Sequence, residues 1–134
     1  MKFLNLAVSA VALAAVALPA SAATTLRIQT HQGADSPAGQ LYKIWEDDVE
    51  TMSNGSLDIE MFYSSSVVGS VETFDAAANG ILDCDMTGGA YQTGKNPAFQ
   101  FVGDVMGGYD TAWQQYSWLY YGDGYDAAQE LYNK

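Results

Sequence analysis

Apolar and polar positions recur along this chain with two different periods. Residues 26–30 and 57–61 alternate between apolar and polar side chains, which is the period of a strand, and residues 81–86 read as a third strand. The segments 37–53 and 70–79 carry apolar residues three and four positions apart, which is the period of a helix. This alternation of strands and helices predicts an α/β fold with a mainly parallel sheet and helices packed against it.

The first predicted helix has residues suited to both of its ends. Ser36 can cap it, and Pro37 fits the first position because proline lacks an N–H that would have no partner there. Asn54 and Gly55 tolerate the left-handed backbone at which many helices end. The acidic residues Asp47, Asp48 and Glu50 are expected in solvent, opposite a stripe of apolar residues: Leu41, Ile44, Trp45, Val49 and Met52.

The second half of the chain has a less regular pattern. Residues 98–106 form a short apolar stretch that we expect to be extended. A further helix is predicted from Asp110 or Thr111, and helical spacing resumes over 125–134. The aromatic residues at 113–121 suit packing inside a domain, although a sugar-stacking surface remains open.

A ligand-binding edge follows from the predicted topology. In open parallel sheets, ligands bind beyond the carboxyl ends of the strands, and the loops 31–35, 63–69 and 87–94 lie at that edge. Helix N-termini at Ser36 and Ser70 point their free N–H groups the same way.

Three residues of these loops are candidate ligand contacts: Gln32, Gly89 and Tyr91. Gln32 carries both donors and an acceptor, which makes it a better candidate than the neighbouring loop residue His31. Tyr91 offers an apolar face and one hydroxyl, but a buried structural tyrosine is an equal alternative. Gly88 and Gly89 allow close backbone approach, either by a ligand or in plain turn geometry.

The N-terminus is typical of a secretory signal peptide, which we place at residues 1–22. Lys2 supplies the positive charge, an apolar run covers 4–18, and Ala20-Ser21-Ala22 is a small-residue cleavage site. An uncleaved membrane anchor is the alternative, although the run is short for a span. The predicted mature chain, 23–134, is soluble and periplasmic. Its surface excludes nucleic acid and anionic membranes as partners, because the chain has a net charge of −11.

The sequence contains no recognisable catalytic motif. Cys84 and His31 are the only cysteine and the only histidine, so a disulfide and a zinc cluster are not expected. Asp83 and Asp85, two positions apart in a predicted strand, suit acid–base chemistry or a cation, but such pairs more often decorate a strand end. No nucleophile motif or phosphate loop is present. We therefore predict that the chain is not an enzyme.

The region 23–134 resembles the beginning of the solute-binding subunit of TRAP transporters, the DctP-type family. The resemblance covers the helix that begins at Ser36 and several short segments in order: 26–30, 53–59, 68–69, 72–76, 80–83 and 94–99. It implies a periplasmic binding protein of two α/β lobes, of which this chain contains most of the first. The resemblance further implies that the protein captures a small organic acid for sodium-driven uptake by the TRAP membrane permease subunits.

The stretch 88–99 is most similar to the subgroup that takes 2-oxo acids, lactate and related monocarboxylates. In that subgroup the tyrosine matched by Tyr91 lines the pocket. The family's carboxylate-binding arginine has no match here, because the one arginine, Arg27, lies inside the first strand. We expect that arginine, and any metal ion that accompanies the ligand, beyond Lys134, in a domain that this chain covers only in part. No cofactor is expected in this chain. A periplasmic sensor module and a secreted α/β enzyme are the alternative functions.

Overall fold

The computed structural model describes residues 22–103 and 108–133. Its centre is a sheet of three strands, all parallel as the sequence predicts, in the order β2-β1-β3. The strands are β1 (Thr24–Thr30), β2 (Leu57–Phe62) and β3 (Cys84–Met86). The predicted signal peptide lies almost entirely outside the described residues. Within the described part, no helix is both long and apolar enough to cross a membrane.

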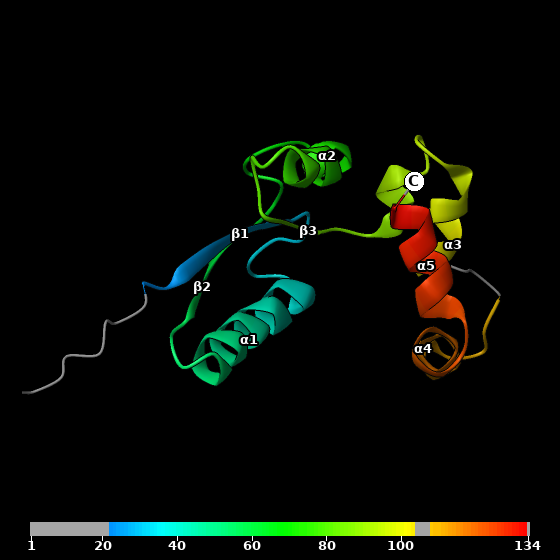
Figure 1. Ribbon diagram of the computed structural model, residues 1–134, viewed down its shortest axis with the longest axis horizontal. Coiled ribbons are helices and arrows are strands. Elements are labelled where there is room, and N and C mark those ends of the chain that lie inside the picture. Colours follow the sequence, from blue (N-terminus) through cyan, green and yellow to red (C-terminus); the bar gives the residue numbers. More distant parts are fainter. Residues whose placement is uncertain (1–21, 104–107, 134) are drawn as a thin grey trace, which may run out of the picture.

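Helices and short 3-10 turns connect and extend the sheet. Figure 1 shows α1 (Pro37–Met52) and α2 (Thr73–Ala78) on opposite sides of the strands. A link from β3 leads to a second group of helices: α3 (Gln100–Gly103), α4 (Ala112–Tyr121) and α5 (Gly124–Tyr132). The 3-10 turns are η1 (Ser70–Glu72), η2 (Gly89–Gln92) and η3 (Pro97–Phe99).

The ends of α1 are formed as predicted. The Ser36 hydroxyl accepts a hydrogen bond from the Gly39 N–H at 3.0 Å, with Pro37 in the first turn. After the helix, Asn54 and Gly55 have φ values of 53° and 74°. Gly39 has a tertiary role as well, because a Cβ there would lie 2.1 Å from the Gly33 carbonyl oxygen. The helix can approach the preceding loop only because residue 39 has no side chain.

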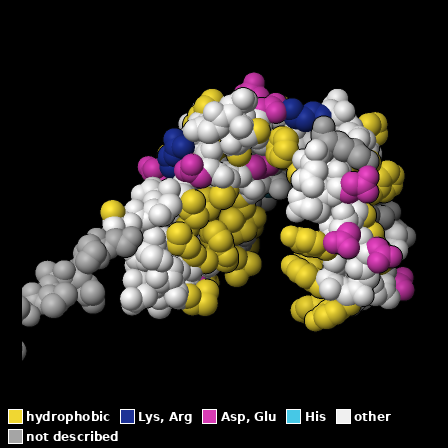
Figure 2. Space-filling model, viewed as in Figure 1, with side chains coloured by type: hydrophobic (Ala, Val, Ile, Leu, Met, Phe, Trp, Pro, Cys, Tyr) yellow, Lys and Arg dark blue, Asp and Glu magenta, His cyan; other side chains and the backbone are white. Residues whose placement is uncertain are grey.

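The apolar stripe of α1 is mostly exposed, and one of the acidic residues expected in solvent is not. Leu41 is 64 % exposed and Met52 is 78 % exposed, and Ile44 and Trp45 are exposed as well. Glu50, expected in solvent, is half-buried, and its carboxylate accepts a hydrogen bond from the Ile59 N–H of β2 at 2.8 Å. This bond and the close approach at Gly39 fix the rotation of the helix. Figure 2 shows hydrophobic side chains gathered beside α1, on the side that looks toward α4.

Two further segments differ from the sequence prediction. The third strand begins at Cys84, because residues 81–83 form a bend in which the Ile81 and Leu82 N–H groups donate to the Ala76 carbonyl of α2. The stretch expected to be extended after residue 97 is instead helical in η3 and α3. Residues 104–107 lie outside the described part. A short apolar run does not distinguish a strand from a buried helical turn by its pattern alone.

A fully buried amide joins the sheet to the loop that follows β2. Gln29 in β1 is 0 % exposed. Its Nε2 donates to the Val68 carbonyl at 3.0 Å and to the Thr73 hydroxyl at 2.7 Å. Its Oε1 accepts from the N–H groups of Val67 and Val68 at 2.8 and 3.1 Å. One side chain therefore fixes both the loop 63–69 and the first residue of α2.

Replacing this amide should destabilise the whole fold. Gln29→Met keeps a similar volume but leaves two backbone N–H groups, one carbonyl and one hydroxyl without their partner. We expect the free energy of unfolding to fall by about 3 kcal/mol, measured by urea unfolding followed by circular dichroism. Gln40→Met on the exposed side of α1 is the matched control, with an expected change within about 0.5 kcal/mol. Equal effects of the two variants would contradict the role of Gln29.

Candidate ligand-binding edge

The loops after β1 and β2 are hydrogen-bonded to each other at the carboxyl edge of the sheet. The Gln32 N–H donates to the Thr30 hydroxyl at 3.2 Å, and the Ser64 N–H donates to the Gln32 carbonyl at 2.9 Å. The Ser65 N–H donates to the Thr30 carbonyl at 3.1 Å. Because Thr30 is completely buried, this part of the edge is fixed to the core rather than carried on a free loop.

Two of the three predicted site residues, Gln32 and Tyr91, both contact His31 at this edge. The ring of Tyr91, in η2, lies against the ring of His31 with centroids 5.0 Å apart and planes tilted by 51°. On its other side, His31 Nε2 lies 2.8 Å from Gln32 Nε2. All three side chains are half-buried. Gln32 and Tyr91 therefore belong to one cluster, with His31 as the link between them.

Gly89, the third predicted site residue, packs closely against residues of η3 and α3. A Cβ at this position would lie 3.1 Å from the Phe99 carbonyl oxygen and 3.2 Å from the Val102 Cβ. The glycine therefore lets η2 pack against η3 and α3, which carries Tyr91 to its place. A direct contact between Gly89 and a ligand stays a prediction.

Several buried polar atoms have no hydrogen-bond partner among the described residues. They include His31 Nδ1, Asp85 Oδ1 and both amide atoms of Gln92, whose side chain is 1 % exposed. Burial raises the pKa of Asp85, and Thr87 and His31 oppose that rise. Asp85 also lines a hollow of about 460 Å³ with residues of α2 and with Tyr132. No pattern in the sequence pointed to Gln92, since a polar residue shortly after Gly88 and Gly89 is typical of an exposed turn.

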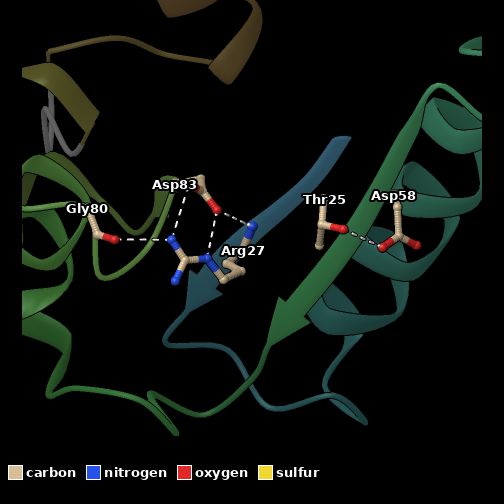
Figure 3. A network of polar contacts seen from close by, with 5 residues as sticks. All are labelled: Thr25, Arg27, Asp58, Gly80 and Asp83. Carbon is tan, nitrogen blue, oxygen red and sulfur yellow. Dashed lines mark hydrogen bonds and ion pairs between the residues drawn. The ribbon is translucent and has the colours of Figure 1, made fainter. Parts of the chain in front are cut away.

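Asp83 and Asp85 do not act as a pair. Arg27 Nε donates to Asp83 Oδ2 at 2.9 Å, and Nη2 donates to Oδ1 at 3.2 Å and to the Gly80 carbonyl at 3.1 Å (Figure 3). The Arg27 N–H donates to the same carboxylate at 2.9 Å. These hydrogen bonds, from the side chain first and the backbone second, lower the pKa of Asp83. Asp83 thus ties the end of α2 to β1, and the guanidinium of Arg27 is committed to that contact.

The strand pair β1–β2 carries a further polar contact in the same view. The Thr25 hydroxyl donates to Asp58 Oδ2 at 3.0 Å (Figure 3).

Within the described part, no group of three or more histidine, cysteine or acidic side chains is placed to hold a metal ion. Burial raises the pKa of the free thiol of Cys84, and nearby Asp83 adds to that rise, which disfavours the reactive thiolate.

Comparison with known proteins relates this arrangement to one family. Residues 28–105 match the family described as bacterial extracellular solute-binding protein, family 7. The chain is 38 % identical over 84 residues to the monocarboxylate 2-oxoacid-binding periplasmic protein of a Nostoc species. That match covers 63 % of this chain and 23 % of the relative.

Solved structures of TRAP periplasmic solute-binding proteins have the same fold over most of this chain. One from Rhodobacter sphaeroides, in an apo open form, is 28 % identical with a TM-score of 0.77, covering 82 % of this chain and 35 % of its own. One from Pseudoalteromonas atlantica, with bound sodium and pyruvate, is 28 % identical with a TM-score of 0.76, covering 83 % and 34 %. One from Colwellia psychrerythraea, with bound calcium and pyruvate, is 27 % identical with a TM-score of 0.73, again covering 83 % and 34 %. The chain thus spans about a third of the length of these structures.

Substituting the two aspartates should change stability in opposite directions. The lowered pKa of Asp83 means that its carboxylate stabilises the fold above the ordinary carboxyl pKa of about 3.9, and this contribution is lost as the pH falls through the lowered value. Asp83→Asn should therefore be less stable than the wild type at neutral pH. The raised pKa of Asp85 means that stability is lost as the pH rises through the raised value, so Asp85→Asn should be more stable at neutral pH.

Urea unfolding at a series of pH values from acid to neutral measures both effects. The difference between each variant and the wild type should shrink as the pH falls below both pKa values of the replaced carboxyl. Arg27→Met is the control for Asp83, and the double variant of Arg27 and Asp83 should add little to either single one. Loss of stability in both aspartate variants at neutral pH would show that Asp85 is held by contacts that the structure does not contain.

Proposed function

Because this chain belongs to the bacterial extracellular solute-binding protein family 7, we propose that it forms one wall of a periplasmic binding site for a small organic acid. The ligand class is a 2-oxo acid, lactate or a similar carboxylate. The observation that carries the proposal is the cluster of Gln32, His31 and Tyr91 at the carboxyl edge of the sheet. Ligands of open parallel sheets bind at this edge.

The chemistry of the edge suits a small acid with a polar group next to its carboxylate. The Gln32 amide offers both donors and an acceptor, and Tyr91 offers a hydroxyl on an apolar ring. The names of the similar proteins support the same class, since one is a 2-oxoacid-binding protein and two hold pyruvate.

The cationic side chains of the described residues are engaged with groups outside the His31 cluster. Arg27 pairs with Asp83, Lys95 pairs with Asp75, and the Lys43 ammonium lies 5.7 Å from the ring centre of Tyr63. With a net charge of −11, the chain as a whole repels an anion. The proposal therefore assigns the arginine that pairs with the ligand carboxylate to a part of the family fold that this chain does not cover. A guanidinium suits that carboxylate because it can donate two parallel hydrogen bonds.

The proposal extends to the protein's place in the cell. The signal peptide at 1–22 directs the chain to the periplasm, where the loaded binding protein delivers its acid to TRAP membrane permease subunits for sodium-driven uptake. The family consists of solute-binding proteins rather than enzymes. In keeping with that, the thiol of Cys84 and the carboxylate of Asp83 lack the surroundings of catalytic groups.

Tyr91→Ala should weaken the binding of pyruvate without unfolding the chain. Titration of the ¹⁵N-labelled protein with pyruvate should shift the amide resonances around Gln32 and Tyr91 in a saturable way. We expect a dissociation constant of about 1 mM, because this chain supplies one wall of the site. The substitution should raise that constant by about tenfold, since it removes a ring and a hydroxyl from the contact.

Tyr121→Ala is the matched control, because Tyr121 is 91 % exposed on α4, away from the sheet edge. Its circular dichroism spectrum and its pyruvate titration should both equal those of the wild type. Wild-type resonances at the edge that do not move with pyruvate, lactate or other 2-oxo acids would overturn the proposed ligand class.

A further inference from the structure

We propose that His31 is a positioning residue of this edge, held in its Nδ1–H tautomer, and that it sets the orientation of the Gln32 amide and the Tyr91 ring. The proposal rests on the proposed function, because it assigns those two residues to the ligand. His31 does not itself need to contact the ligand. It acts through the two side chains that it contacts, Gln32 and Tyr91.

The contact between His31 and Gln32 specifies the tautomer. The two atoms that meet at 2.8 Å are Gln32 Nε2 and His31 Nε2. An amide nitrogen only donates hydrogen bonds, so His31 Nε2 accepts, and the proton of the neutral ring is on Nδ1. The reverse orientation of the amide would place Gln32 Oε1 there and require the Nε2–H tautomer. The position of one proton therefore reports which way the Gln32 amide faces.

An acidic side chain of the neighbouring strand lies near the imidazole. The sheet register pairs Gln29 of β1 with Asp85 of β3, which places Asp85 next to the start of the loop that carries His31. His31 Nδ1 and Asp85 Oδ1 are both buried and have no partner among the described residues. Burial raises the pKa of Asp85, and the charge of His31 is near enough to oppose that rise. A nearby negative charge favours a proton on the ring, and the contact with Gln32 specifies that this proton is on Nδ1.

The contact between the His31 and Tyr91 rings holds Tyr91 against the end of the rigid strand β1. His31 follows Thr30, which is 0 % exposed, and lies two residues after the buried amide of Gln29. The 5.0 Å separation of the His31 and Tyr91 ring centroids lies in the range of favourable aromatic pairs. Tyr91 sits on the short turn η2, whereas His31 sits at the end of a strand. The imidazole therefore gives the tyrosine a fixed surface to pack on.

The tautomer can be measured directly, because His31 is the only histidine in the chain. Long-range ¹H–¹⁵N correlation spectra of the ligand-free chain, at a pH where the imidazole is neutral, should give the pattern of a protonated Nδ1 and an unprotonated Nε2. A dominant Nε2–H form, or the unequal mixture of a free imidazole, would overturn the proposed orientation. This measurement does not depend on pyruvate.

Two variants then separate the two contacts of His31. His31→Phe keeps a ring against Tyr91 but removes the acceptor for Gln32, whereas His31→Gln keeps a polar group but removes the ring. Each should weaken pyruvate binding by about fivefold, the effect of one ordinary hydrogen bond or ring contact. The amide resonances of the Gln32 side chain should shift in His31→Phe before any ligand is added. Unfolding midpoints close to that of the wild type show that the fold is intact.

The outcomes distinguish this inference from the proposed function. If Tyr91→Ala weakens binding and both His31 variants bind pyruvate as the wild type does, the positioning role is wrong and the function stands. If the wild type itself does not respond to carboxylates, the function fails, and the tautomer still decides the geometry at His31. If only His31→Phe loses affinity, the role of the ring contact with Tyr91 is overturned. If only His31→Gln loses affinity, the role of the hydrogen bond with Gln32 is overturned.

Discussion

The hydrogen bonds of the buried Gln29 side chain hold the sheet, the loop after β2 and α2 together. Four hydrogen bonds from one amide satisfy the backbone of the loop after β2 and the hydroxyl at the start of α2. An apolar residue at this position would leave those groups buried and unpaired, which is costly inside a protein. With the amide in place, the loop 63–69 can cross the sheet edge in one conformation. The hydrogen bonds between that loop and Gln32 then follow.

The sequence predicts those features of the fold that depend on neighbouring residues. Strand alternation, the Ser36 cap and the turn at Asn54 and Gly55 are local, and they are found where predicted. The rotation of α1 depends on Gly39 meeting Gly33 and on Glu50 meeting Ile59, which are contacts between separate segments. An apolar stripe indicates that a helix has two faces, but it does not say which partner covers each face.

The candidate edge was predictable in the same partial way. Topology alone placed Gln32 and Tyr91 at one edge, because loops that follow parallel strands share that edge. The ring contact that joins them through His31 connects two loops sixty residues apart, and no local pattern encodes it. Alternation does not reveal the burial of Gln29 either, because a polar position in a strand does not show whether its side chain meets water or a buried loop. Aspartates 83 and 85 look equivalent in the sequence, but the pairing of Asp83 with Arg27 and the burial of Asp85 shift their pKa values in opposite directions.

The exposed apolar side of α1 has a consequence for how this chain behaves in concentrated solution. Its large net negative charge keeps copies apart, while Leu41, Ile44 and Met52 provide an adhesive surface on each copy. Dissolved ions screen the repulsion between copies beyond about 8 Å at physiological ionic strength, but they do not weaken the association of apolar surfaces. Added salt should therefore turn a mutually repelling solute into a clustering one, and ionic strength becomes a variable to fix in every measurement on this chain.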